Sequence, residues 1–353
     1  MSATSFFWTI INHVYSPDAV LDISAGAKAL ILSDVHMGSG RRDDLIENGD
    51  LLISLLENYY LAQGWYLVLN GDIEELQRYS LDRITQRWKH LYRIFSLFAN
   101  QNRLYKLIGN HDEELLLKKS YCYPLYNVIR IDTGIMPAYV YHGHQLSKLY
   151  RNYNKLVGAA LRYVLKPFGI KNISSARSPN RRFRTEKAAY TFSLDNNCIS
   201  IIGHTHRPLF ESLGRFDYIK FEIERLCRDY TVSSEEDKQR IETEVCTLRQ
   251  ELGKLGRKER RDVLRHSLYG DELPVPCLFN SGSAISKKGL TAIEISNEDI
   301  ALVYWYADGC GRRFVSRGGY AIDKLAGTNC NRVVLNSNRL DYIQSRIKLL
   351  GKR

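Results

Sequence analysis

The sequence predicts an α/β protein in which two mixed β-sheets face each other and helices cover the outside. Up to about residue 112, short apolar runs alternate with helical patterns, which is typical of strands joined by crossovers into a largely parallel sheet. After about residue 138 strand patterns dominate, so we expect a second sheet packed on the first. A chain of 353 residues is long enough to bury the core that this fold needs.

The first half of the chain contains three apolar runs that each end at a polar turn. We expect buried strands over residues 29–32, 65–69 and 104–108. Leucines at helical spacing predict a helix over residues 43–63 that stops at Gly64, and a second one over about 81–99. The resulting alternation of strands and helices is the basis for the first sheet.

Further strands are predicted in the second half of the chain. Apolar runs cover residues 138–141, 198–202, 277–279, 290–295 and 300–306. The last two runs flank the polar stretch Ser296-Asn297-Glu298-Asp299, which predicts a hairpin. We expect one domain over residues 1–353 with its core at about 28–306, followed by a C-terminal tail at about 307–353.

Two charged stretches interrupt this pattern and are predicted to be insertions. Residues 145–189 hold eleven Lys or Arg and one acid, Glu186, with apolar residues interleaved as in an amphipathic helix. In residues 215–271, Ser233 and Glu236 match a capping box, which predicts a projecting helical hairpin. The hairpin is a candidate for homodimer contact, and solvated packing without a function is the alternative. The helix seam there consists of Ile241, Val245, Leu248, Leu252 and Leu255.

Charge and cysteine content limit the classes of function. The net charge of +11 favours anionic partners such as phosphorylated substrates, nucleic acid or an acidic membrane surface, although solubility alone also accounts for it. Seven scattered cysteines without a Cys-x-x-Cys pair argue against a disulfide framework or a zinc knuckle. Residues 1–14 make a poor signal peptide, and no apolar run is long enough to span a membrane. We therefore expect a cytoplasmic protein, with peripheral membrane contact left open.

Five short motifs rich in metal ligands follow apolar runs in one order along the chain. Six of the nine histidines lie in them. Each motif alone is a weak signal, but the ordered set, each member after a strand pattern, predicts a site for two divalent metals. The motifs are Asp34-Val35-His36, Gly71-Asp72, Gly109-Asn110-His111-Asp112, His142-Gly143-His144 and Gly203-His204-Thr205-His206.

These residue types suit the hydrolysis of a phosphate ester. Two metals about 3.5–4 Å apart neutralise the phosphoryl oxygens and make a water nucleophilic near pH 7. Asp34 and His36 are two residues apart at a strand end and can both reach one metal, whereas His204 and His206 can straddle the pair. Asn110 can ligate through its carbonyl oxygen without adding charge. Mixed oxygen and nitrogen ligands suit Mn, Fe, Zn and Co alike, and we favour Mn.

With these motifs in this order, the sequence resembles the calcineurin-like metallophosphoesterase superfamily. The resemblance covers about residues 28–144 and 198–306 and includes the turn Asn280-Ser281-Gly282-Ser283. It implies the double-sheet sandwich of metallophosphoesterases and the hydrolysis of a phosphate mono- or diester by a metal-bridging hydroxide, with no covalent enzyme intermediate.

The resemblance also implies a role for each residue of the motifs. His111 would orient the phosphate and protonate the leaving oxygen, and Asp112 would hold His111 in its tautomer. Asp72 would bridge the two metals. The first metal would be bound by Asp34, His36 and His206, and the second by Asn110, His142 and His204.

Other residues near the motifs have more than one candidate role. His144 is open between a metal ligand and a substrate contact; we favour His142 as the ligand because it directly ends the apolar run. Arg41 and Arg42 are candidate substrate contacts, with a solvated loop as the alternative. Glu74 and Glu75 follow Asp72 and either brace the metal surroundings, face the substrate or sit as ordinary carboxylates at a helix start.

The substrate is left open between several classes. The first motif with Met37-Gly38-Ser39, and the position of the first insertion, are similar to bacterial UDP-2,3-diacylglucosamine pyrophosphatases, which implies a nucleotide-lipid pyrophosphatase as the alternative. A phosphorylated small molecule or a lipid-linked substrate is the favoured partner. Nucleic acid is less favoured because the basic insertion lacks regular aromatic interleaving. Readings of another class are a catalytically silent binding scaffold and a nucleic-acid-binding protein without hydrolysis.

Overall fold

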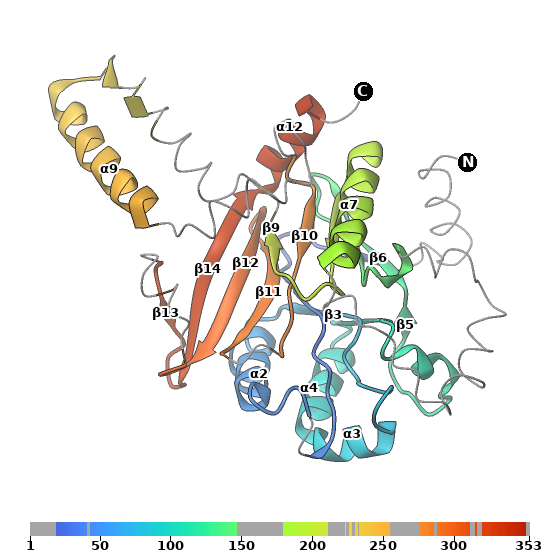
Figure 1. The fold of residues 1–353 in the computed structure, drawn as a ribbon. Coiled ribbons are helices and arrows are strands. Elements are labelled where there is room, and N and C mark those ends of the chain that lie inside the picture. Colours follow the sequence, from blue (N-terminus) through green and yellow to red (C-terminus); the bar gives the residue numbers. More distant parts are fainter. Residues whose placement is uncertain are drawn as a thin grey trace.

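Two β-sheets pack face to face at the centre of the molecule, as the computed structural model shows (Figure 1). The structure describes residues 19–40, 43–146, 179–210, 233–254, 275–285, 288–310 and 320–350, with a few single residues between them. In these residues the first sheet has six strands in the order β1-β6-β7-β8-β10-β9. Its strands are β1 (Val20–Asp22), β6 (Val128–Asp132), β7 (Pro137–Tyr141), β8 (Ile199–Ile202), β9 (Leu209–Phe210) and β10 (Leu278–Asn280).

The second sheet has eight strands within the described residues, in the order β13-β14-β12-β11-β2-β3-β4-β5. They are β2 (Ala29–Leu32), β3 (Tyr66–Asn70), β4 (Leu104–Leu107), β5 (Leu125–Tyr126), β11 (Leu290–Ser296), β12 (Asp299–Ala307), β13 (Asp323–Lys324) and β14 (Cys330–Arg339). β2, β3 and β4 run parallel, and β11 is antiparallel to β2. The prediction of an α/β fold with two mixed sheets is confirmed.

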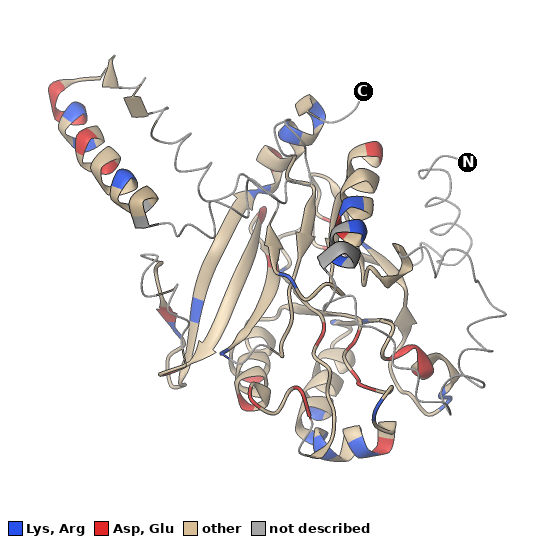
Figure 2. Ribbon diagram, in the orientation of Figure 1, with Lys and Arg blue, Asp and Glu red and all other residues tan. Residues whose placement is uncertain are grey.

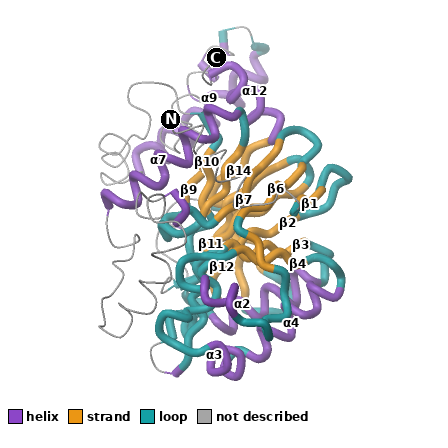
Figure 3. The backbone as a smooth tube through the Cα atoms, turned by 90° about the vertical axis from the view of Figure 1, so that its right-hand side faces the viewer, coloured by secondary structure: helices purple, strands orange, loops and turns teal. Residues whose placement is uncertain are grey.

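Helices lie outside the two sheets (Figure 3). α2 and α4 pack on the second sheet, and α7 packs on β8 and β10 of the first. α9 projects away from the sheets with charged residues along its length (Figures 1 and 2). The helices are α2 (Gly49–Leu55), the π-helix η2 (Leu56–Leu61), α3 (Leu81–Arg87), α4 (Lys89–Asn100), α7 (Pro179–Asn196), α9 (Glu235–Lys254) and α12 (Leu340–Leu350), with 3-10 turns η3 (Glu113–Leu117) and η4 (His144–Leu146). Among the described helices, none combines the length and apolar character that a membrane crossing needs.

The middle of the second sheet is buried on both faces, which explains why β2 and β3 read as continuous apolar runs. In β2, Ile31 faces the core between the sheets, and Leu30 and Leu32 face the core beneath α2 and α4. Each such side chain contributes roughly 1.5–3 kcal/mol when it leaves water completely. The two layers of core hold β2 rigidly, and with it the residues that follow its carboxyl end.

The two helices predicted in the first half differ in detail from the observed ones. The stretch predicted at 81–99 is broken at Trp88, whose indole N–H lies 2.9 Å from Asp43 Oδ2 and 3.2 Å from the carbonyl oxygen of Gly38. The stretch predicted at 43–63 becomes helical only at Gly49, because the Asp43 carboxylate accepts the N–H groups of Gly38 and Leu45 and holds a turn. Tertiary hydrogen bonds therefore override the local helical spacing.

Part of the stretch assigned to the C-terminal tail at about 307–353 extends the second sheet. β14 pairs along its length with β12, and β13 pairs with β14. α12 then adds Leu340, Ile343 and Ile347 to the core between the sheets. The sheet therefore continues past residue 306, where the sequence placed the end of the core.

The structure describes only part of each predicted insertion. Residues 147–178 lie outside the described residues, and α7 forms the end of the first insertion. In the second, α9 is capped by Ser234, whose Oγ accepts the N–H of Asp237, so the capping residue predicted at Ser233 was wrong by one position. Ile241 of the predicted seam is buried, but the dimer contact stays a prediction.

Candidate metal centre

The predicted ligands lie at or just after the carboxyl ends of five strands. Asp34 follows β2, Asp72 follows β3, and Asn110 follows β4, the three parallel neighbours of the second sheet. His142 directly follows β7 and His204 follows β8, which run parallel in the first sheet. Because parallel strands end at the same edge, these turns converge between the two sheets.

Backbone conformation aims these side chains inward. Asp34, His36, Asp72, His204 and His206 all have φ between 48° and 64°, a region that residues other than glycine rarely adopt. Such conformations persist where the surroundings fix them, and they cluster at functional sites.

Glycines in two of the motifs allow the carboxylates to approach closely. A Cβ on Gly109 would lie 2.1 Å from Asp72 Oδ1, and one on Gly203 would lie 2.7 Å from Asp34 Oδ2. Any larger residue at these positions would therefore displace a carboxylate that the sequence predicts to be a ligand.

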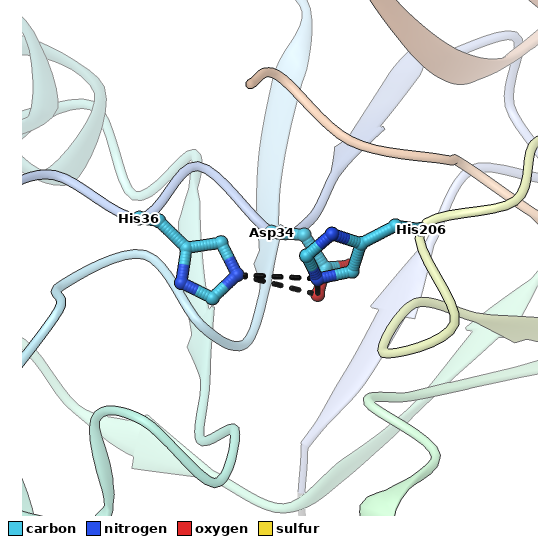
Figure 4. Close-up of side chains that lie close together, drawn as sticks. All are labelled: Asp34, His36 and His206. Atoms are coloured by element: carbon cyan, nitrogen blue, oxygen red, sulfur yellow. Dashed lines mark hydrogen bonds and ion pairs between the residues drawn. The ribbon is translucent and has the colours of Figure 1, made fainter. Parts of the chain in front are cut away.

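Asp34, His36 and His206 form the first ligand group (Figure 4). His206 Nε2 lies 3.0 Å from Asp34 Oδ1 and 3.2 Å from His36 Nε2. All three candidate ligand atoms lie within 4.8 Å of one another, which is a separation that one cation can bridge. This is the set that the resemblance assigned to the first metal.

Asp72, His142 and His204 form a second group with the same spacing. His142 Nε2 lies 3.2 Å from Asp72 Oδ2. Asp72 also belongs to a third group, with His36 and His111, so it lies between the first and second groups. The position of Asp72 is therefore the one that a bridging ligand needs.

The unpaired atoms of the site fit the binding of cations. Asp34 Oδ1, Asn110 Oδ1 and His142 Nε2 are buried and make no hydrogen bond of regular geometry. Asp34 Oδ1 lies 3.0 Å from His206 Nε2, and His142 Nε2 lies 3.2 Å from Asp72 Oδ2 and 4.0 Å from Asp34 Oδ1. Buried acceptor atoms without a donor carry a free-energy cost that a bound ion removes. Asn110 was predicted to ligate through this same oxygen.

In the metal-free site Asp34, Asp72 and His204 have the protonation states of ligands, whereas His142 does not. Burial acts to raise the pKa of Asp34 and Asp72, but nearby imidazoles hold both below the usual range: His206 and His142 for Asp34, His142 and His111 for Asp72. Burial and the neighbouring His142 lower the pKa of His204 to about 3, so this imidazole is neutral at pH 7. Burial acts to lower the pKa of His142, but the charges of Asp72 and Asp34 raise it to about 9, so His142 must lose a proton when it binds a metal ion. Anionic carboxylates and a neutral imidazole are the forms that bind metal ions.

Glu75, not Asp112, holds the imidazole of His111. His111 Nδ1 lies 2.9 Å from both carboxylate oxygens of Glu75, and His36 Nδ1 lies 3.0 Å from Glu75 Oε2. The role predicted for Asp112 was therefore wrong. Glu75 follows Asp72 by three residues, but spacing alone did not show which of Glu74 and Glu75 points inward.

Asp112 instead joins the turns after β3 and β4. Its carboxylate accepts the N–H of Gly109 at 2.6 Å and the N–H of Ile73 at 2.9 Å, and it pairs with Lys106 Nζ at 2.7 Å. Lys106 also lies 2.9 Å from Glu74, which accepts hydrogen bonds from Tyr92 and Tyr121. This buried network fixes the two turns that carry Asp72, Asn110 and His111.

Of the three predicted substrate contacts, the structure describes His144. Arg41 and Arg42 lie outside the described residues. His144 is only 5% exposed; its Nε2 lies 3.5 Å from Glu113, and its ring centre is 5.5 Å from that of His142. A substrate contact of His144 stays a prediction.

Comparisons with known proteins identify a family. The sequence matches the family model described as calcineurin-like phosphoesterase over residues 27–232. No curated protein matches it at a significant level. The comparisons do not show the resemblance to UDP-2,3-diacylglucosamine pyrophosphatases.

Solved structures with some similarity include YfcE, a phosphoesterase from E. coli, at 12% identity over 78% of this chain and 91% of that one, with a TM-score of 0.32. A single mutant of Vps29 from Entamoeba histolytica is 11% identical over 88% and 99% of the two chains, with a TM-score of 0.35. Vacuolar Protein Sorting 29 from Cryptosporidium parvum is 10% identical over 81% and 94%, with a TM-score of 0.34. The family assignment rests on the family model alone.

Proposed function

The chain belongs to the calcineurin-like phosphoesterase family, and we propose that it hydrolyses a phosphate mono- or diester at a centre of two divalent metals. The observation that supports the dinuclear centre most strongly is Asp72, which shares ligand groups with His142 and His204 on one side and with His36 on the other. When bound, the two ions would neutralise the phosphoryl oxygens and lower the pKa of a water that attacks phosphorus.

The residues of this chain have separate tasks in the proposal. Asp34, His36 and His206 hold one ion, and Asn110, His142 and His204 hold the other, with Asp72 between them. We favour Mn²⁺, and the donor set equally suits Fe, Zn and Co. A phosphorylated small molecule or a lipid-linked phosphate is the substrate class that we propose.

His111 is the proposed general acid for the leaving oxygen. Its Nε2 lies 4.0 Å from Asp72 Oδ2, and its side chain keeps an exposed fraction of 18%, so a substrate can reach it. Burial acts to lower its pKa, but the charge of Asp72 and the hydrogen bond to Glu75 raise it to about 9 in the metal-free protein. Glu75 holds Nδ1, so the proton at Nε2 is the one available for transfer.

A hydrolysis assay with added Mn²⁺ tests the proposal. The substrates are bis-p-nitrophenyl phosphate, p-nitrophenyl phosphate, a UDP-linked pyrophosphate and a short oligonucleotide, each with wild type and Asp72→Asn. We expect turnover of at least one substrate, and we expect Asp72→Asn to lose more than roughly 100-fold of that activity. Loss of a residue that only supports a metal ligand costs up to roughly 100-fold, and loss of a ligand itself should cost more. Asp72→Asn protein that is folded and equally active would contradict the dinuclear centre. Metal-loaded wild type that hydrolyses none of the four would contradict the proposed substrate range.

A further inference from the structure

The turn that carries His204 and His206 has an unfavourable backbone. His204 has φ of 64° and His206 has φ of 54°, so two residues with side chains adopt the left-handed region on either side of Thr205. Such a conformation is retained only where the surroundings fix it. Thr205 is fully buried between them, so the groups that contact its side chain help to fix the turn.

Two residues from distant parts of the chain hold Thr205. Asn280, just at the end of β10, donates from Nδ2 to Thr205 Oγ1 at 2.9 Å and to the carbonyl oxygen of Gly203 at 3.1 Å. The Thr205 hydroxyl in turn donates to Glu186 Oε1 at 2.9 Å. The hydroxyl therefore accepts one hydrogen bond and donates another, and its position is fixed from two sides.

Glu186 contacts the turn on both sides of His206. Besides Thr205, its carboxylate binds the guanidinium of Arg207. Arg207 Nε donates to Glu186 Oε1 at 3.1 Å, and Arg207 Nη2 donates to Glu186 Oε2. Glu186 is 1% exposed, and a carboxylate this deeply buried is tolerated only with such partners. One side chain thus links the two residues that flank a proposed metal ligand.

The position of Glu186 is set by α7 and not by the turn. Four residues further on, Tyr190 lies on the same helix face, and its hydroxyl accepts the N–H of Val275 at 3.2 Å. Ser193 donates to Ser200 of β8 at 2.7 Å, and Ala189 is buried in the core between helix and sheet. α7 is therefore anchored independently of the metal ligands and presents Glu186 to them.

We propose that Glu186 is a positioning residue: through Thr205 and Arg207 it holds His204 and His206 in the geometry that binds divalent metal. The proposal rests on the metal centre proposed above and adds that α7, the end of the basic insertion, sets its affinity. Glu186 is the single acid in residues 145–189, and it points to the metal-binding turn instead of to solvent. Loss of a residue that supports a metal ligand typically weakens binding about 10–100-fold.

Titration of the metal-free full chain with Co²⁺ tests this role. Binding is followed by calorimetry and by the visible absorption of the bound Co²⁺, with Glu186→Ala, Glu186→Gln and wild type compared. We expect Glu186→Ala to bind Co²⁺ about 10–100-fold more weakly, with a shifted absorption spectrum. Glu186→Gln keeps an acceptor for Thr205 and should lie closer to wild type. The matched control is Arg184→Ala, which removes an exposed charge from the same helix and should bind as wild type does.

The outcomes separate this proposal from the one on which it rests. Wild type that binds no Co²⁺ would remove the metal centre and with it the role of Glu186. Wild-type affinity and spectrum in folded Glu186→Ala would overturn the positioning role alone. If Glu186→Ala does not fold, Thr205→Val and Thr205→Ser are compared, because serine keeps the hydroxyl that donates to Glu186 and valine lacks it. Co²⁺ binding that is weaker in Thr205→Val but not in Thr205→Ser supports the proposal. Wild-type binding in both variants overturns it.

Discussion

Replacing Glu75 with glutamine removes the charge that holds His111 and leaves the side-chain volume almost unchanged. Glu75 contacts Nδ1 of His111 at 2.9 Å and Nδ1 of His36 at 3.0 Å, and it is 2% exposed. A glutamine can accept only one of these hydrogen bonds in the same way, and it carries no charge to stabilise an imidazolium. The variant therefore tests whether His111 acts as a proton donor that depends on Glu75.

The expected size of the effect follows from the contacts. A buried hydrogen bond to a charged group contributes about 1.5–3 kcal/mol, which corresponds to a roughly 10–100-fold loss of rate if the bond acts in the transition state. The pKa of His111 is about 9 in the metal-free protein, raised by Asp72 and Glu75 against the opposing effect of burial. Without the charge of Glu75 this pKa must fall, since protonation loses part of its stabilisation.

Two assays measure this effect. Nuclear magnetic resonance of metal-free protein follows the titration of the His111 ring, whose midpoint should move down from about 9 in Glu75→Gln. Steady-state kinetics with p-nitrophenyl phosphate and with an alkyl phosphate compare a good with a poor leaving group. A general acid matters most for the poor leaving group, so the alkyl ester should lose more activity.

Asp112→Asn is the matched comparison for Glu75→Gln. Asp112 directly follows His111 in the chain, but its carboxylate binds Lys106 and two backbone N–H groups and not His111. We expect Asp112→Asn to lower stability and to leave the His111 titration in place. A titration midpoint that moves in Asp112→Asn and stays fixed in Glu75→Gln would refute the assignment, as would an equal loss on both substrates in Glu75→Gln.

Three further predictions follow from the site and its surroundings. Lys106→Met leaves Glu74 and Asp112 buried without their cation, so the free energy of unfolding in urea should fall by about 3–5 kcal/mol, and a change below about 1 kcal/mol would contradict the network. Gly109→Ala should abolish Co²⁺ binding because the new Cβ would lie 2.1 Å from Asp72 Oδ1, whereas Gly253→Ala in α9 meets nothing within 4 Å and should bind normally. The pKa of His111 is raised from 6.5 to about 9 in the metal-free fold, so protonation of His111 contributes its full stabilisation below pH 6.5. The free energy of unfolding in urea should therefore decline as pH rises through about 9, and a value that stays constant from about pH 6 to 10 would contradict this.

Much of the central architecture could be predicted because strand and ligand signals coincide. The apolar run at 29–32 corresponds to β2 residue for residue, and the hairpin predicted around residues 296–299 is the antiparallel pair of β11 and β12. β14 and α12 were missed because β14 has a largely polar, only partly buried sequence and depends on β12 for its partner. Pairing between distant segments is not visible in local patterns.

The ligands were easier to predict than the residues that support them. Histidine and aspartate at strand ends carry their chemistry in the motif, and Asp34, His36 and His206 meet as expected. Glu75 contacts His111, which is 36 positions away in the sequence, and Glu186 contacts Thr205, which is 19 positions away. The packing of the turns and of α7 brings these residues together. Which of two adjacent carboxylates faces a histidine depends on turn geometry, which spacing does not specify.

Anomalous diffraction from crystals of the protein soaked with Mn²⁺ tests the central claim most directly. We expect two anomalous peaks about 3.5–4 Å apart, with an Asp72 oxygen in contact with both ions. One peak should contact Asp34, His36 and His206, and the other Asn110, His142 and His204. A single peak, or two peaks that Asp72 does not join, would contradict the dinuclear centre.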